Sequence, residues 1–320
     1  MSTRFLDPRI CIVPVLMSCN AVAAADVTAK AVSFNTTDGV RIAADYYAPR
    51  KSVEPAPIAI LLHMYNSDRS AWKPLIEPLH EAGFAILAID MRGHGAGATD
   101  ELKELARKRD RKMFKAMEKD VFAAYEWVSK QGDVDRSRLA IVGASVGCSV
   151  ALRYTVSDPS VDAVVCMSPG LKYLAINSSV DIKRFHGRKL LFLASEEERN
   201  AADQLKKLGD TAGKKAKSPV VANEIETRIV GEGRVHGTAM FGKIDGIEQR
   251  IVDFLKENVG GWSEDTVYGA WKDKKFHKAD SAWSRSADQT KVRHLSDPDE
   301  AKRRGLKSAD DKPKLRTQGS

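Results

Sequence analysis

Short apolar runs alternate with amphipathic stretches along most of this 320-residue chain. Residues 57–63 (PIAILLH) form an uninterrupted apolar run, as in a strand that is buried on both faces. Residues 114–131 instead repeat their apolar side chains at helical spacing. One helical face of that stretch carries Phe114, Met117, Val121, Ala124 and Val128. This alternation predicts an α/β fold, with a mostly parallel central sheet and helices on both faces.

Further expected elements run through the body of the chain. Residues 27–37 and 41–49 alternate apolar and polar residues around Asp38 and Gly39, which predicts a hairpin. More strands are expected at residues 84–90, 138–145, 161–169, 188–195 and 225–231. More helices are expected at residues 70–83, 146–157, 202–210 and 246–259. Sheets of this type bind ligands at the carboxyl ends of their strands, so we expect the functional site there.

The net charge of +8 does not by itself indicate a nucleic-acid-binding protein. Residues 261–320 contribute +4 of it, with 14 Lys and Arg against 10 Asp and Glu, and residues 1–25 contribute +1. The remaining body, residues 26–260, therefore carries only +3. This distribution describes a mildly basic body with a basic tail, so no nucleic-acid partner is expected. No internal stretch offers ~20 apolar residues in a row, which excludes a multi-span membrane protein.

The first 25 residues have the layout of an export signal. Arg4 and Arg9 precede an apolar stretch at residues 10–17, and small residues follow. Cleavage after Ala25 would release a soluble periplasmic or extracellular protein. Alternatively, the sequence LMSC resembles a bacterial lipobox, in which Cys19 would become a lipidated N-terminus and attach the protein to a membrane. Both interpretations predict an exported protein, and the oligomeric state is left open.

After residue 260 the chain becomes polar and charged. The tail, residues 261–320, is interpreted either as a flexible basic appendage or as a degenerate small module. Short strands are expected at residues 267–271 and 290–296, and a helix at residues 297–307. The order KKFHKADSAW (274–283) followed by SDPDEAKRRGLKSADDK (296–312) resembles a small metal-binding module of bacterial DNA alkyl-repair proteins. Where that module has cysteines this chain has Ser281, Ala309 and Lys312, which leaves His277 without sulfur partners, and no metal site is expected.

Two of the four cysteines lie in the body of the chain. Cys148 falls in an expected helix and Cys166 in an expected strand, so we interpret both as small buried apolar residues. Two such cysteines make neither a disulfide framework nor a zinc site. We therefore expect no cofactor and no metal.

The sequence Gly143-Ala144-Ser145-Val146-Gly147 follows an expected strand directly and opens an expected helix. In that setting a G-x-S-x-G motif forms a sharp turn that exposes the serine hydroxyl above the sheet. The helix N-terminus offers backbone N–H groups, including that of Val146, to a developing oxyanion. Ser145 is therefore the candidate nucleophile.

A serine nucleophile needs a base, and the base needs an acid that orients it. His236 lies on the loop between the last strand and the last helix, in the order Ser, acid, His that this fold uses. The acid is expected just after the strand at residues 188–195, where Glu196, Glu197 and Glu198 follow one another. Glu198 is our choice and Glu197 the second candidate.

The body of the chain, over about residues 30–260, resembles the α/β-hydrolase superfamily, nearest to esterases of the dienelactone-hydrolase-like and serine-aminopeptidase-like types. The resemblance rests on ILLHMYNSDRSAW (60–72), AIDMRGHGAG (88–97), GASVG (143–147), LFLASEEER (191–199) and RVHGTAMF (234–241). It implies a second oxyanion N–H from the loop after the strand at residues 57–63. Met64 stands where the family has glycine, so Met64 or Tyr65 would supply that group, and Tyr65 is our choice. His94, within the stretch 88–97, is expected to be structural.

These residues predict a serine hydrolase that cleaves a carboxylic ester, or a lactone or amide, through a Ser-His-Glu triad and an acyl-enzyme. Fewer than twenty residues separate two of the expected strands, so no large lid is expected, and short acyl esters are the default small-molecule substrates. The charged insertion at residues 98–115 is interpreted as a solvated helix face, and the alternative is that it covers the pocket edge and favours anionic substrates. The alternative hypothesis is a catalytically silent envelope protein of the same fold that binds anionic surface polymers.

Overall fold

The computed structural model describes most of the body of the chain and short parts of its tail. The described residues are 27–50, 55–158, 161–185, 189–215, 224–259, 267–270, 275–278, 293–295, 298–303 and 306–309. The predicted export signal, with Cys19, lies outside them. Among the described helices, none combines the length and apolarity that crossing a bilayer requires.

Eight strands form the central sheet that the alternating pattern predicts. Their bounds are β1 (Lys30–Asn35), β2 (Arg41–Tyr47), β3 (Ala56–Leu62), β4 (Ala85–Ile89), β5 (Val134–Ala144), β6 (Val161–Met167), β7 (Lys189–Ala194) and β8 (Glu224–Ile229). They lie side by side in the order β1-β2-β4-β3-β5-β6-β7-β8. β2 pairs antiparallel with both β1 and β4, and all the later pairings are parallel. The prediction of a mostly parallel sheet is confirmed.

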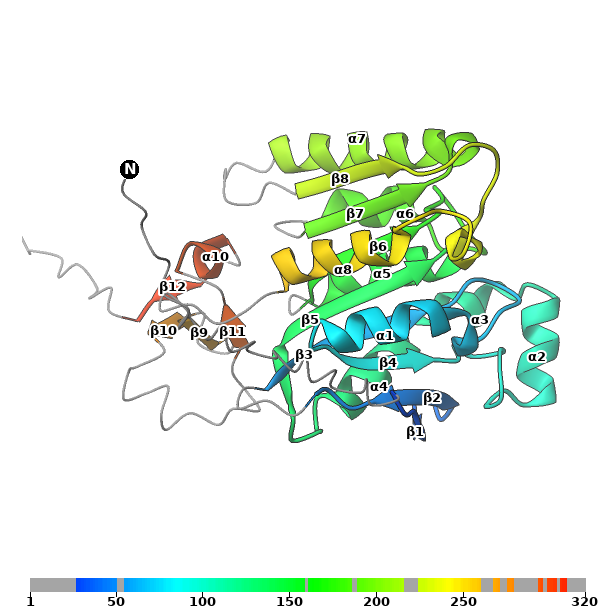
Figure 1. Cartoon of the computed structure of the whole chain (residues 1–320), viewed down its shortest axis with the longest axis horizontal. Helices are drawn as coiled ribbons and strands as arrows, with labels where there is room; N and C mark the ends of the chain where they lie inside the picture. Colours follow the sequence, from blue (N-terminus) through cyan, green and yellow to red (C-terminus); the bar gives the residue numbers. More distant parts are fainter. Residues whose placement is uncertain are drawn as a thin grey trace, which may run out of the picture.

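Helices cover both faces of this sheet (Figure 1). On one face lie α1 (Lys73–Glu81) and α8 (Ile247–Asn258), and their side chains form one buried cluster with that side of the strands. On the other face lie α4 (Glu118–Val128), α5 (Val146–Ser157) and α7 (Arg199–Lys215), which share a second cluster. The strands are buried on both faces because each cluster uses alternate residues of the same strands.

The helix expected at residues 114–131 is interrupted. α3 (Arg111–Lys115) contains Phe114, and α4 begins only at Glu118. Between them the backbone N–H groups of Ala116, Met117 and Lys119 donate three residues back, a tighter turn than the α-helix makes. The five apolar side chains predicted to share a face are nevertheless all buried. Hydrophobic spacing alone does not distinguish one continuous helix from two short ones in series.

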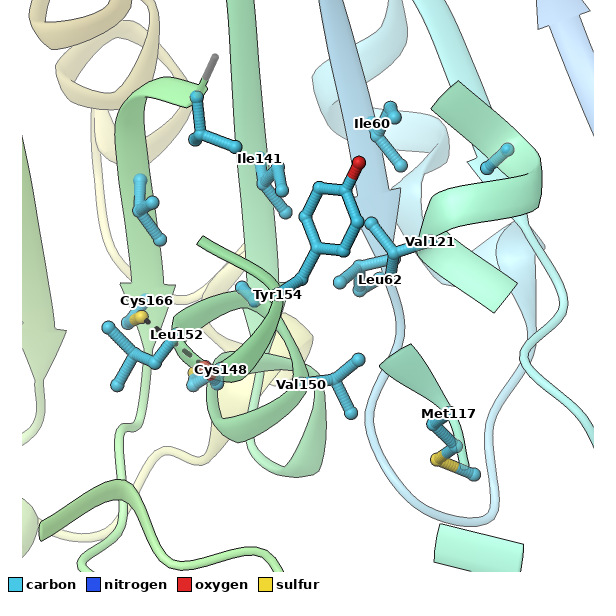
Figure 2. Packing of buried hydrophobic residues seen from close by; sticks show 14 of the residues in the cluster. Ile60, Leu62, Met117, Val121, Ile141, Cys148, Val150, Leu152, Tyr154 and Cys166 are labelled. Atoms are coloured by element: carbon cyan, nitrogen blue, oxygen red, sulfur yellow. Dashed lines mark hydrogen bonds between the residues drawn. The ribbon is translucent and has the colours of Figure 1, made fainter. Parts of the chain in front are cut away.

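Cys148 and Cys166 lie in the core between α5 and β6 (Figure 2). Both are free and fully buried, as predicted. The Cys148 thiol lies 3.2 Å from the Gly143 carbonyl oxygen and 3.1 Å from that of Met167. Burial raises the pKa of Cys148 well above its usual range, so the thiol stays protonated. It packs beneath the turn that carries Ser145.

Part of the tail folds into a second, four-stranded sheet in the order β11-β9-β10-β12. Its strands are β9 (Val267–Ala270), β10 (Lys275–Lys278), β11 (Arg293–Leu295) and β12 (Lys307–Ser308), with α10 (Pro298–Arg303) beside them. Phe276, Ala301 and Leu306 form its small buried cluster. The elements expected near residues 267–271, 290–296 and 297–307 are present, whereas β10 and β12 were not expected, because each offers one apolar side chain or none.

Candidate active site

Ser145 lies on a strained turn between β5 and α5. Its φ of 54° and ψ of −113° belong to a region that residues with a side chain rarely occupy. The flanking glycines leave no room for a methyl group. A Cβ on Gly143 would come within 2.5 Å of the Gly147 carbonyl carbon, and a Cβ on Gly147 within 2.2 Å of the Leu62 carbonyl oxygen. The motif has the strand-turn-helix setting that its chemistry requires.

The structure brings His236 and Glu198 into direct contact. Nδ1 of His236 lies 2.6 Å from Oε1 of Glu198. Glu198 ends a short 3₁₀ turn, Glu196–Glu198, immediately after β7, while His236 lies in the loop after β8. Of the two candidate acids, Glu198 is the one that meets the imidazole, and Glu197 is exposed to solvent.

Glu198 is held as a carboxylate. Burial raises its pKa, but the hydrogen bond with His236 and the nearby Ser168 hydroxyl outweigh that effect, so its pKa is lower than that of an ordinary glutamate. Arg234 contributes in the same direction at 3.8 Å. An ionised acid fixes the tautomer and orientation of its histidine and stabilises the positive form of the ring.

Sequence reasoning missed Ser168, which follows β6 and is 1% exposed. Its φ of 57° is positive, and its hydroxyl accepts a hydrogen bond of 2.8 Å from the Gly237 N–H. The same hydroxyl lies beside Glu198 and lowers its pKa. Ser168 therefore ties the loop that carries the acid to the loop that carries the histidine. The triplet Ser-Pro-Gly at the end of β6 was the available signal.

The loop after β3 carries the predicted oxyanion donors. The Tyr65 hydroxyl donates to the Ala106 carbonyl at 3.2 Å, and its ring contacts those of His94 and Phe114 edge-on. These contacts fix the loop against α2 (Asp100–Arg107), part of the charged insertion. The backbone N–H groups of Tyr65 and Val146 donate in none of the hydrogen bonds found among the described residues, which leaves them available to a ligand.

Met64, the other candidate, turns its side chain toward the histidine loop. Its sulfur lies 3.8 Å from the Thr238 hydroxyl, and a Cβ on Gly237 would come within 3.0 Å of it. Met64 thereby occupies the position of the family's glycine and packs against the segment that follows His236. The distances do not decide between the two backbone N–H groups, so Tyr65 stays a prediction.

His63 and His94 have structural contacts. Nε2 of His63 accepts the Met91 N–H at 3.0 Å while Nδ1 faces the Met64 carbonyl at 2.7 Å, which joins the ends of β3 and β4. Burial lowers the pKa of His63 to about 4, so the ring is neutral at physiological pH. His94 is buried, and its Nδ1 lies 3.1 Å from the Arg92 carbonyl.

The stretch from Asp90 to Gly95 forms a tight turn beside these histidines. The Asp90 carboxylate accepts backbone N–H groups of Arg69 and Ala96 and pairs with the Arg69 guanidinium. A Cβ on Gly95 would come within 2.0 Å of that carboxyl group, which explains the glycine. The Asp90 carboxylate therefore holds the turn together and joins it to Arg69.

Tyr173 is the second residue that the sequence analysis did not find. It lies in the loop after β6, and its ring meets the His236 ring edge-on at 6.4 Å. Its hydroxyl interacts with the Ser145 side chain. Burial is the main cause that raises the pKa of Tyr173 to about 12, so the phenol keeps its proton.

No hydrogen bond joins Ser145 to His236 within the described part of the chain. In unliganded hydrolases the hydrogen bonds between catalytic residues are often long or poorly aligned.

Comparison with known proteins places the chain in a family. The model of the acetyl xylan esterase family (AXE1) matches residues 14–184. The chain belongs to this family and, with it, to the α/β-hydrolase superfamily, as the sequence predicted. The family supports a hydrolase of the ester type. Across the residues that the structure describes, no group of three or more His, Cys, Asp or Glu side chains is arranged to hold a metal ion.

Individual relatives are more distant. An uncharacterised protein of Mycobacterium tuberculosis strain H37Rv is 33% identical over 138 residues, which are 43% of this chain and 44% of that protein. The chain thus spans less than half the length of that curated relative. An esterase of Pyrococcus furiosus superposes with a TM-score of 0.58 at 18% identity, covering 73% of this chain and 94% of its own. A dienelactone hydrolase of Anabaena variabilis superposes with a TM-score of 0.51 at 18% identity, covering 72% and 95%. These two structures establish the shared fold.

Proposed function

We propose that this protein is a serine esterase in which Ser145, His236 and Glu198 form a catalytic triad. The observation that carries the proposal is the 2.6 Å contact between His236 and Glu198, on loops that meet beside the strained turn of Ser145. A half-buried, ionised carboxylate on Nδ1 leaves Nε2 as the proton acceptor, which a serine nucleophile needs. A histidine with a merely structural role has no requirement for this arrangement.

The proposed reaction has two half-reactions. In the first, Ser145 Oγ attacks the ester carbonyl, its proton moves to Nε2 of His236, and the N–H groups of Val146 and Tyr65 bind the oxyanion. The carbon–oxygen bond to the alcohol then breaks, and His236 returns its proton to the departing oxygen. In the second, water gives a proton to His236 and attacks the acyl-serine carbonyl. His236 then returns that proton to Ser145 Oγ as the acyl carbon–oxygen bond breaks, which releases the acid and free Ser145.

Short acyl esters are the proposed substrates. The family model takes its description from acetyl xylan esterase, which suggests an acetyl group on the hydroxyl of a carbohydrate. Between β6 and β7 the described residues contain only α6 (Ser178–Asp181) and a single 3₁₀ turn, too little to cover a long acyl chain. Export, either as a released protein or through a lipidated Cys19, fits a polymeric substrate outside the cell and forms part of the proposal.

Fluorophosphonate labelling of the full-length protein tests the function directly. We expect the wild type to be labelled and the Ser145→Ala and His236→Ala variants, folded by circular dichroism, to remain unlabelled. A folded wild-type protein that no fluorophosphonate labels would contradict the esterase and support the silent binding protein instead.

The acid is tested by a matched pair of neighbours. Glu198→Gln keeps the size of the side chain but removes the charge, and we expect kcat on p-nitrophenyl acetate to fall about 10³- to 10⁴-fold, as for the acid of other triads. Glu197→Gln is the control, because that side chain is exposed, and kcat should stay within about twofold. If the two variants were equally active, Glu198 would not be the triad acid.

A further inference from the structure

The loop that carries Tyr173 holds an unusual turn. Leu174 and Ala175 both have positive φ, 44° and 76°, although neither is glycine. Tyr173 and Ile176 close the turn by exchanging backbone hydrogen bonds of 3.0 and 2.7 Å. Two-residue turns of this kind favour Asn-Gly or Gly-Gly, because a Cβ is disfavoured at both central positions. Strain of this sort persists where the surrounding structure enforces it, and it clusters at functional sites.

The turn fixes one side chain above the catalytic serine. The Tyr173 ring packs on Gly170, where an added Cβ would come within 2.5 Å of the ring. In this unliganded structure its hydroxyl donates a long hydrogen bond of 3.5 Å to the Ser168 carbonyl oxygen, and it interacts with the Ser145 side chain. The ring edge rests on His236. One phenol therefore lies beside both the nucleophile and the base of the proposed triad.

The sheet order decides which part of a substrate this hydroxyl would meet. β3 and β6 flank β5 on opposite sides. The predicted oxyanion donor Tyr65 follows β3, whereas Tyr173 follows β6, so the two lie on opposite sides of Ser145. In the first half-reaction the departing oxygen must lie beside His236, which protonates it. Tyr173 is on that side of the nucleophile.

We infer that Tyr173 is a further catalytic residue, whose hydroxyl donates a hydrogen bond to the alkoxy oxygen of the departing alcohol. The inference rests on the proposed esterase function. As the carbon–oxygen bond breaks, negative charge grows on that oxygen, and His236 supplies the proton that neutralises it. Tyr173 keeps its own proton throughout and only stabilises the charge. Its raised pKa of about 12 keeps it a donor across the working range of pH.

The consequence is a dependence on the leaving group. Nitrophenolate departs readily without help, whereas an alkoxide needs both protonation and stabilisation. We therefore expect Tyr173→Phe to lower kcat/KM for ethyl acetate about 10- to 100-fold, the range for a hydrogen bond to a charged group. For p-nitrophenyl acetate the decrease should stay below about threefold. Both substrates form the same acetyl-enzyme, so kcat/KM isolates the step in which the alcohol leaves.

Two further variants complete the test. Lys172→Ala, at an exposed position in the same loop, is the control and should leave both values unchanged. Gly170→Ala keeps the hydroxyl but displaces the ring, so it should reproduce the selective loss on ethyl acetate, and it serves as the test if Tyr173→Phe fails to fold.

Equal losses on the two esters, or no loss on either, would overturn the role of Tyr173. Fluorophosphonate labelling separates that outcome from a failure of the proposed function. If Tyr173→Phe is labelled like the wild type and shows no leaving-group selectivity, only the inference fails. If the wild type itself is neither labelled nor active on p-nitrophenyl acetate, the esterase proposal fails and the inference falls with it.

Discussion

Replacing the candidate nucleophile by glycine should make this protein more stable than replacing it by alanine. At φ 54° and ψ −113°, a residue with a Cβ is strained by about 1–3 kcal/mol, and Ser145→Ala keeps that strain. Ser145→Gly removes it, but loses about 0.4–1 kcal/mol because glycine gives the unfolded chain more freedom. The glycine variant should therefore unfold with a free energy about 1–2 kcal/mol higher than that of the alanine variant.

The difference between the two variants reports the backbone conformation at residue 145, because both variants lack the buried hydroxyl and should both be inactive. For a domain of this size, about 1–2 kcal/mol corresponds to a difference in Tm of about 2–8 °C. Thermal melts and urea titrations measure it. The control is the same pair at Lys207, exposed in the middle of α7, where glycine should be less stable than alanine by about 1 kcal/mol. If Lys207 behaves so and Ser145→Gly is no more stable than Ser145→Ala, the turn stores no strain.

Two further predictions concern the frame of the site. Gly147→Ala would place a Cβ 2.2 Å from the Leu62 carbonyl oxygen, so we expect a loss of about 2 kcal/mol or more in urea titrations, whereas Gly132→Ala, with nothing within 4 Å, should be near neutral. His63 has a pKa of about 4 when folded against about 6.5 unfolded, so the unfolded chain binds the extra proton between these values. Its contribution of about 3 kcal/mol is complete above pH 6.5 and is lost as the pH falls toward 4. Urea titrations from pH 7.5 to 4.5 should show this slope in the wild type and a shallower one in His63→Gln, where His94, whose pKa burial also lowers, still contributes. An unchanged slope would contradict the assignment.

Much of the architecture could be predicted because a strand that is buried on both faces of a parallel sheet has a continuous apolar run in the sequence. The run at residues 57–63 became β3, and the helix expected at residues 146–157 has those bounds. Short elements leave a weaker trace. β12 has two residues and is held by backbone pairing with β10, so no pattern of side chains predicts it. The break between α3 and α4 likewise depends on local hydrogen bonds, since both helices bury the same face.

Some residues of the candidate site could likewise be predicted from the sequence, and others could not. Ser145 and His236 could be proposed from the order of motifs along the chain, and Glu198 from its place after β7. Ser168 and Tyr173 could not, because their roles depend on which loops meet above the sheet. Ser168 matters through an N–H 69 residues away, and Tyr173 through a turn whose residues, Leu174 and Ala175, carry no sequence signal of positive φ.

The packing around Gly143 and Gly147 has a consequence for how this enzyme could diversify. The turn that carries Ser145 packs against Leu62 with no space for one added carbon. Gly143 and Gly147 must therefore stay glycine as the protein diverges. The charged insertion, residues 98–115, meets the site through Tyr65, whose hydroxyl donates to the Ala106 carbonyl and whose ring contacts Phe114. Grafting this insertion from relatives would change the surroundings of Tyr65 while Ser145, His236, Glu198 and Tyr173 stay in place, which makes it the natural crossover point for building chimeric proteins of this fold.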